Sequence, residues 1–290
     1  FPGVIVSEYG AIEELLNHRV AGSREEAGGL ALDATVDIDM MSDIFRTLPR
    51  TPEVEKAVDQ AVIRVLTLKK DLGLFDDPYR YLDVEREAQV VMNPEYRRGA
   101  REAAAKGAVL LENRNSLLPL KLDGVKQIAV IGPLAADARS ALGEWNLVGR
   151  AEDTVSPLLG LKQNFEKRGI KVVHAEGCPS WEPDRSGISK AAQLAAESDL
   201  VILVLGEPYD ATGESRNRTQ IGLPGSQQQL LEAIAAKGKP TVTVLANGRP
   251  LALTEVKDLT PTLLVLWHAG IESGNALYDL LVGDVPIGGK

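Results

Sequence analysis

The chain has 290 residues, of which 44% are hydrophobic, and this length favours two domains with ordinary cores. Its formal net charge of −9 argues against nucleic acid or an anionic membrane as a partner. The single cysteine, Cys178, excludes an internal disulfide, and we expect its thiol to be an inert packing group. The histidines are far apart and fit no metal-binding spacing, and no apolar run has transmembrane length.

The first part of the chain contains two strand patterns and three helix patterns. Glu8 follows the first strand directly, which is where barrel enzymes place catalytic groups. Alternatively, Glu8 only begins the next helix, near the positive end of its dipole. Ser23 with Glu26 predicts a capping box, and Thr51 with Pro52 predicts a capped helix start. The expected strands cover residues 3–7 and 36–40, and the expected helices cover residues 11–18, 23–34 and 51–72.

Strands and helices alternate in the second part of the chain, which predicts a doubly wound α/β sheet. A helix beginning at Asn93-Pro94 and ending near Gly107 precedes this region, and we place the domain boundary near residue 120. The expected strands cover residues 127–131, 171–174, 200–205, 241–245 and 263–267, and the expected helices cover residues 156–168, 188–197, 227–237 and 273–282.

A doubly wound sheet also raises the hypothesis of nucleotide binding. The first strand of this region ends in Val130-Ile131-Gly132-Pro133, which has no glycine-rich phosphate motif and no Lys-Ser/Thr loop. Pro133 also lacks an amide that a phosphate would need. The sequence therefore disfavours a nucleotide site.

A long loop, residues 206–225, follows the continuous apolar run of residues 200–205. Such a run is typical of a parallel strand buried on both faces, so the loop is expected at the carboxyl end of a central strand. Open α/β sheets bind their ligands at that edge, and loops of this length are usually functional or disordered. Ser226 with Gln229 predicts a capping box at the start of the next helix.

The long loop contains three carboxylates and two arginines. A carboxyl group near guanidinium groups can be tuned for proton transfer. From composition alone, however, a solvated and salt-bridged surface loop is the favoured interpretation. The charged residues are Glu207, Asp210, Glu214, Arg216 and Arg218.

Several motifs occur in a characteristic order along nearly the whole chain. They are Ser7-Glu8-Tyr9, Leu74-Phe75-Asp76-Asp77-Pro78, Leu117-Leu118-Pro119, the loop with Gly213-Glu214, and the segment around Trp267. In this order the chain resembles glycoside hydrolase family three, the β-glucosidase-like enzymes. The resemblance implies the last two strand-helix units of a (β/α)8 barrel in residues 1–85, a linker and connecting helix in residues 86–120, and an α/β sandwich domain in residues 121–290. The first six barrel strands would be missing, so we expect the chain to be a piece of a longer protein.

The resemblance also implies roles for individual residues. The position of Glu214 is the general acid/base of the family, and the position of Glu8 is its nucleophile. The family has an aspartate there, so Glu8 is one methylene longer. Tyr9, Arg216 and Arg218 are the implied substrate-binding residues, although either arginine could instead hold the loop in place. Retaining hydrolysis needs the two carboxyl groups about 5–5.5 Å apart, which the resemblance implies at the interface of the two domains.

The function implied by the resemblance is a retaining, exo-acting β-glycoside hydrolase without cofactors. A β-glucosidase that releases terminal glucose from β-glucosides or oligosaccharides is the main expectation. The alternative is a non-catalytic or crippled carbohydrate-binding fragment, because Glu8 replaces an aspartate and most of the barrel is absent. The implied partners are a β-linked glycoside and the missing N-terminal barrel segment, and a homo-oligomer is left open. A periplasmic or extracellular location is slightly favoured over a cytoplasmic one.

Overall fold

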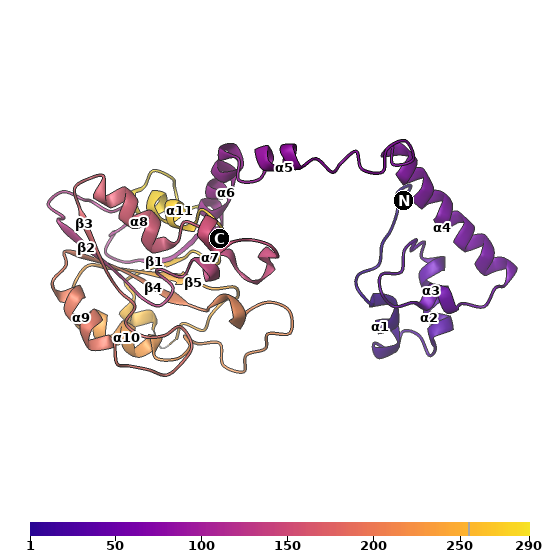
Figure 1. Cartoon of the computed structure of the whole chain (residues 1–290). Helices are drawn as coiled ribbons and strands as arrows, with labels where there is room; N and C mark the ends of the chain where they lie inside the picture. Colours follow the sequence, from indigo (N-terminus) through magenta and orange to yellow (C-terminus); the bar gives the residue numbers. More distant parts are fainter. Residues whose placement is uncertain (255) are drawn as a thin grey trace. The chain divides into compact units, whose positions relative to one another are not determined.

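The computed structural model describes residues 1–254 and 256–290, and it divides the chain into two compact units, Phe1–Val91 and Met92–Lys290 (Figure 1). This division falls earlier than the boundary expected near residue 120. Helix α6 (Pro94–Gly107) packs against helix α11 (Ser273–Val282), and strand β1 (Val109–Asn113) pairs with strand β6 (Thr262–Val265). Residues 92–120 of the expected linker therefore belong to the second unit, and residues 86–91 belong to the first. No helix in the described part of the chain is both long and apolar enough to cross a membrane.

The first unit is a small helical body with a short strand contact. Thr51 accepts a hydrogen bond from the Val54 amide, so the predicted cap of α4 is present, and Ser23 accepts one from the Glu26 amide. The predicted capping box is only half formed, because the Glu26 carboxylate accepts from the amide of Gly22, one residue before Ser23. The two predicted strands form only a single parallel bridge, between Val6 and Ile38. A pair of strands without further neighbours is marginally stable, which explains the short contact. The helices are α1 (Ala11–Asn17), α2 (Arg24–Asp33), α3 (Ile44–Thr47), α4 (Pro52–Asp71) and α5 (Val84–Val90).

The second unit is built on a six-stranded sheet with the order β1-β6-β5-β4-β2-β3. Strand β1 is antiparallel to β6, and the remaining pairs are parallel, as the alternating pattern predicts. The sequence pattern does not predict β1 as a strand, because no crossover helix leads from it into the parallel series. The other strands are β2 (Gln127–Ile131), β3 (Lys171–Ala175), β4 (Leu200–Gly206) and β5 (Thr241–Ala246).

Helices cover both faces of the sheet, and this arrangement explains the continuous apolar runs in its strands (Figure 1). Ile202 and Val204 of β4 pack in the core with α6, α8 (Pro157–Glu166) and α11. Their neighbours Val201 and Leu203 pack in the other core, with α9 (Ile188–Ala196) and α10 (Gln227–Ala235). Every residue of β4 is buried, which places the end of this strand at the centre of the carboxyl edge. The remaining helices are α7 (Ala138–Leu142) and the 3₁₀ turns η1 (Glu144–Asn146), η2 (Ala151–Asp153), η3 (Tyr209–Ala211) and η4 (Lys257–Leu259).

Helices α8 and α11 approach each other at two glycines. A Cβ atom on Gly160 would lie 2.3 Å from the carbonyl carbon of Gly274, and one on Gly274 would lie 2.0 Å from the carbonyl oxygen of Ser156. Phe165 and Tyr278 pack edge to face beside this crossing, with ring centroids 5.1 Å apart. The absence of side chains at the two glycines thus lets the backbones come together.

Candidate active site

In the first unit, Glu8 and Tyr9 lie in a turn that follows the bridge to residues 36–40. Ser7 Oγ accepts a hydrogen bond of 2.8 Å from the Met40 amide, and the Gly10 amide donates one of 2.8 Å to the Met40 carbonyl. These bonds fix the turn on both sides of Glu8. The side chains of Glu8 and Tyr9 are exposed, Tyr9 by 63%. The turn therefore presents a carboxylate and a phenol to solvent.

Asp37 lies beside the short strand contact that leads into this turn, and it has a structural role. Its carboxylate accepts hydrogen bonds of 2.8 Å from the Ile5 amide and 2.7 Å from Arg64 Nε. Burial alone would raise the pKa of Asp37, but the bonds from Arg64 and Ile5 hold this pKa below its usual value. Asp37 is thus a buried, ionised anchor, whereas Glu8 is accessible to a ligand.

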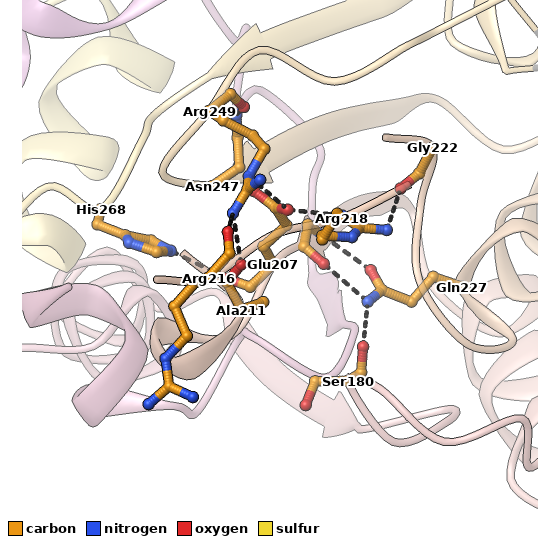
Figure 2. A network of polar contacts seen from close by, with 11 residues as sticks. Ser180, Glu207, Ala211, Arg216, Arg218, Gly222, Gln227, Asn247, Arg249 and His268 are labelled. Atoms are coloured by element: carbon orange, nitrogen blue, oxygen red, sulfur yellow. Dashed lines mark hydrogen bonds and ion pairs between the residues drawn. The ribbon is translucent and has the colours of Figure 1, made fainter. Parts of the chain in front are cut away.

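In the second unit, the structure separates the three carboxylates of the long loop into two environments. Asp210 and Glu214 are exposed, whereas Glu207 is completely buried. Glu207 Oε1 forms ion pairs with Arg218 Nη1 at 2.5 Å and with Arg249 Nε at 3.2 Å (Figure 2). Glu207 is therefore closed off from any substrate, and Glu214 is free to reach one.

The backbone around Glu214 has an unusual conformation. Gly213 on one side has φ 107°, and Ser215 on the other side has φ 58°. A Cβ atom on Gly213 would lie 2.4 Å from Cγ of Glu144, so glycine is required there by space as well as by conformation. Left-handed backbone at a residue other than glycine is uncommon and occurs preferentially at functional sites.

The two arginines of the loop lie in opposite directions. Arg218 is largely buried, donates a hydrogen bond of 3.0 Å from Nη2 to the Gly222 carbonyl, and lies 5.3 Å from the centre of the Trp181 ring. These are the contacts of a residue that holds the loop. The guanidinium of Arg216 is exposed and points away from the cluster (Figure 2). Binding of substrate by Tyr9, Arg216 and Arg218 stays a prediction.

The predicted capping box at Ser226 is wrong. The Ser226 side chain forms no capping bond, because its backbone (φ −101°, ψ 17°) is not in the extended conformation of an ordinary N-cap. Gln227 instead ties the helix to the sheet. Its side chain is buried, accepts from the Gly206 amide and donates to the Gly206 and Ser180 carbonyls, all at 2.7–2.8 Å. The loop is thereby closed at its base.

Two further residues that sequence reasoning missed reach the same place from neighbouring strands. Arg249 follows β5, and His268 follows β6, so both lie at the carboxyl edge where β4 ends. His268 Nε2 donates to the Glu207 carbonyl over 3.0 Å, and burial lowers the pKa of its ring. The sequence could have indicated both residues, because each directly follows a predicted strand and parallel strands end at the same edge of a sheet.

A hollow of about 330 Å³ lies beside the loop and is lined by Trp181, Ala211, Ser215 and Asn217, among others. This volume is within the range of about 300–1,000 Å³ that is usual for ligand sites.

Cys178, three residues before Trp181 in the sequence, is buried, and burial raises the pKa of its thiol to about 12. Among the residues that the structure describes, no group of three His, Cys, Asp or Glu side chains is placed to hold a metal ion.

Residues 108–290 match the family model described as the glycosyl hydrolase family 3 C-terminal domain. The chain belongs to glycoside hydrolase family 3. This match confirms the family that the sequence motifs resemble and the α/β sandwich of the second unit.

Members of family 3 match the chain over its whole length. It is 38% identical to the periplasmic β-glucosidase of Salmonella typhimurium and 36% identical to a β-xylosidase of Formosa agariphila, with 100% of the chain covered in both. The chain spans 41% and 42% of the length of these relatives. Because both activity names occur among them, family 3 membership alone does not select the sugar.

Solved family 3 structures share the fold closely. A mutant of a β-glucosidase from Listeria innocua in complex with laminaribiose is 36% identical and has a TM-score of 0.86 over 98% of this chain. The same enzyme in complex with glucose is 38% identical and has a TM-score of 0.84. The chain covers 39% of the Listeria chain in both comparisons.

Proposed function

We propose that this chain contributes both catalytic carboxylates to a retaining, exo-acting β-glycoside hydrolase, with β-glucosides as its substrates. The observation that carries the proposal is the exposed Glu214 on the loop that follows β4 at its carboxyl end, in a chain of family 3. Loops at this edge of an α/β sheet are where ligands bind. We also propose that residues 1–85 supply the last two strand-helix units of a barrel.

In the proposed mechanism, Glu8 attacks the anomeric carbon and forms a glycosyl-enzyme, while Glu214 protonates the leaving oxygen. Glu214 then takes a proton from the water that attacks the glycosyl-enzyme, and this water releases the sugar with its configuration retained. The exposure of both side chains supports these roles, since each can reach a ligand. Each carboxylate comes from a different unit of the chain.

The choice of a β-glucoside rests on the relatives. The Listeria enzyme is crystallised with laminaribiose and with glucose, and the Salmonella relative is named a periplasmic β-glucosidase. That name also supports a periplasmic or extracellular location for this protein. A β-xyloside is the next candidate substrate, because the Formosa relative is named a β-xylosidase.

The substitution Glu214→Gln in the full-length protein that carries this chain tests the acid/base role. Without a proton donor, we expect kcat/KM for a β-linked disaccharide to fall about 10²–10⁴-fold. A dinitrophenyl β-glucoside, whose leaving group needs no proton, should lose far less in the glycosylation step. The neutral variant of the other exposed loop carboxylate, Asp210→Asn, should leave the ratio of the two rates unchanged. Equal slowing of both substrates by Glu214→Gln would remove Glu214 from this role.

A second candidate function is a non-catalytic or crippled carbohydrate-binding protein, and the glutamate at position 8 is the observation that favours it. The assay that separates the two uses nitrophenyl β-glycosides, with the 290-residue chain alone and with the full-length protein. Hydrolysis by the full-length protein supports the enzyme. Binding of a β-glucoside without turnover supports the second candidate.

A further inference from the structure

We infer that the buried carboxylate of Glu207 is a positioning residue for Glu214, which it holds through two arginines without touching substrate. This inference rests on the proposed function, because it assigns a partner to the proposed acid/base. Its basis is the cluster of Glu207, Arg218 and Arg249 at the end of β4 (Figure 2).

The first step concerns where Glu207 is attached. Its amide donates a hydrogen bond of 2.9 Å to the Ala246 carbonyl at the end of β5, and its carbonyl accepts one of 3.0 Å from His268 after β6. The backbone of Glu207 is therefore bonded to the ends of both β5 and β6, next to the buried strand β4. Its side chain begins from a fixed point at the carboxyl edge of the sheet.

The second step concerns what the arginines hold. Arg249 Nη2 donates to the Ala211 carbonyl over 2.5 Å and to the Arg216 carbonyl over 3.1 Å. These two carbonyls lie on either side of Glu214 in the sequence. The short segment that carries Glu214 is thus tied at both ends to a single guanidinium, which is itself paired with Glu207.

Arg218 extends the same attachment further along the loop. Its Nη1 pairs with Glu207 and its Nη2 bonds to the Gly222 carbonyl, while the ring of Trp181 lies against the guanidinium. One carboxylate therefore holds three points of the loop, at residues 211, 216 and 222, in a fixed relation to the sheet.

The third step concerns energy. Two charges taken out of water lose hydration that their attraction only partly restores, so a buried ion pair is weak support for stability. Here Oε2 of Glu207 and Nε of Arg249 also have no hydrogen-bond partner among the described residues, so the contact of 3.2 Å between Glu207 and Arg249 is an ion pair only. An apolar cluster would stabilise the unit as well, so the charged one is better explained by the loop geometry that it imposes.

The consequence for catalysis follows from the geometry. Misplacement of a reacting group by about 1 Å can lower a rate about a hundredfold. Loss of the Glu207 charge would release the carbonyls at residues 211 and 216 and let Glu214 move. The chemical signature of this movement is a defect in proton donation, although Glu207 itself donates no proton to the substrate.

The test is Glu207→Gln in the full-length protein, since glutamine has nearly the same volume and no charge. We expect kcat/KM for a β-linked disaccharide to fall about 10–100-fold, with a much smaller fall for a dinitrophenyl β-glucoside. In a Glu214→Gln background, Glu207→Gln should cause no further leaving-group-dependent loss, because the group that it positions is gone.

Asp279→Asn is the matched control, because Asp279 is also a buried carboxylate paired with an arginine, Arg101, in the contact between α6 and α11. It should lower the thermal stability without changing the ratio of the two rates. Arg249→Lys is the second variant should Glu207→Gln not fold. It keeps a charge beside Glu207 but loses the two carbonyl bonds, and it should give the same leaving-group signature.

Equal slowing of both substrates by Glu207→Gln, or a full additional loss in the Glu214→Gln background, would overturn the inference while leaving the proposed function intact. The proposed function is tested by Glu214→Gln alone. If that variant shows no dependence on the leaving group, the proposed function is overturned and the positioning of an acid/base by Glu207 falls with it.

Discussion

The carboxylate of Glu8 is one methylene longer than the aspartate that the family resemblance implies at this position. The turn that carries it is fixed by Ser7 and Gly10, so the backbone has little freedom to compensate for the extra length. We therefore predict that Glu8→Asp in the full-length protein raises kcat by up to about 100-fold, because moving a misplaced carboxylate back by about 1 Å can change a rate by that factor. Steady-state rates on a nitrophenyl β-glucoside measure this change.

Glu14→Asp is the control for the substitution at Glu8, because it shortens an exposed glutamate of helix α1 in the same unit. This variant should leave kcat unchanged. A loss of activity on Glu8→Asp would mean that the site is built around glutamate, and the departure from the family would then be an adaptation of this protein.

For the long loop, residues 206–225, the sequence predicts the position but not the different environments of the individual carboxylates. Glu207, Asp210 and Glu214 are equally charged and close in sequence, and only burial separates them. The burial of Glu207 depends on Arg249, which comes from the end of another strand. To predict such an ion pair, one must know which strands are neighbours in the sheet. The composition of one loop does not give this information.

Helices α8 and α11 cross at Gly160 and Gly274, and this element contact gives a prediction about stability. Alanine normally favours a helix over glycine. At Gly160 its Cβ would lie 2.3 Å from backbone of α11, so we predict that Gly160→Ala lowers the free energy of unfolding by about 1–3 kcal/mol. Urea denaturation followed by circular dichroism measures this change.

Gly99→Ala in α6 is the matched control, because Gly99 is exposed and has open space at its Cβ position. It should raise the free energy of unfolding by about 0.5–1 kcal/mol through helix propensity alone. If both substitutions were stabilising, the close approach of α8 and α11 at Gly160 would not be required for their packing.

The elements of the second unit were more predictable than those of the first for a physical reason. Strands such as β4 are buried on both faces, so their sequence is a continuous apolar run that is readily assigned as a strand. The strands predicted near Val6 and Ile38 form only one bridge, because a ladder needs further neighbours. Strand β1 was not predicted, because no helix separates it from β2 and it therefore stands outside the alternating pattern.

For the molecule as a whole, the packing of α6 and β1 predicts where the second unit can be separated. Arg97 and Arg101 of α6 form ion pairs with Glu272 and Asp279, and Ala105 is buried in the core. A polypeptide of residues 92–290 should therefore fold cooperatively. One of residues 121–290 lacks α6 and β1, and it should lose much of the about 5–15 kcal/mol that stabilises an ordinary domain.

Urea titrations of the two polypeptides, followed by far-UV circular dichroism, compare their stability. The unfolding midpoint of residues 92–290 should equal that of the second unit in the whole chain. Identical midpoints and m values for the two polypeptides would contradict the prediction, since they would mean that α6 and β1 contribute nothing to this fold.

The pairing of β1 with β6 has a consequence for the synthesis of the protein. Val109 is translated long before its partner Val265, so the first strand of this sheet leaves the ribosome without the neighbour that it will have in the finished molecule. The contact order of this pair is the highest in the sheet, and contacts of high order form late because a long loop must close first. The parallel strands β2 to β5 can assemble while β1 waits. The nascent chain thus carries an unpaired edge strand while the residues between β1 and β6 are synthesised, and during this interval chaperone contact would matter most.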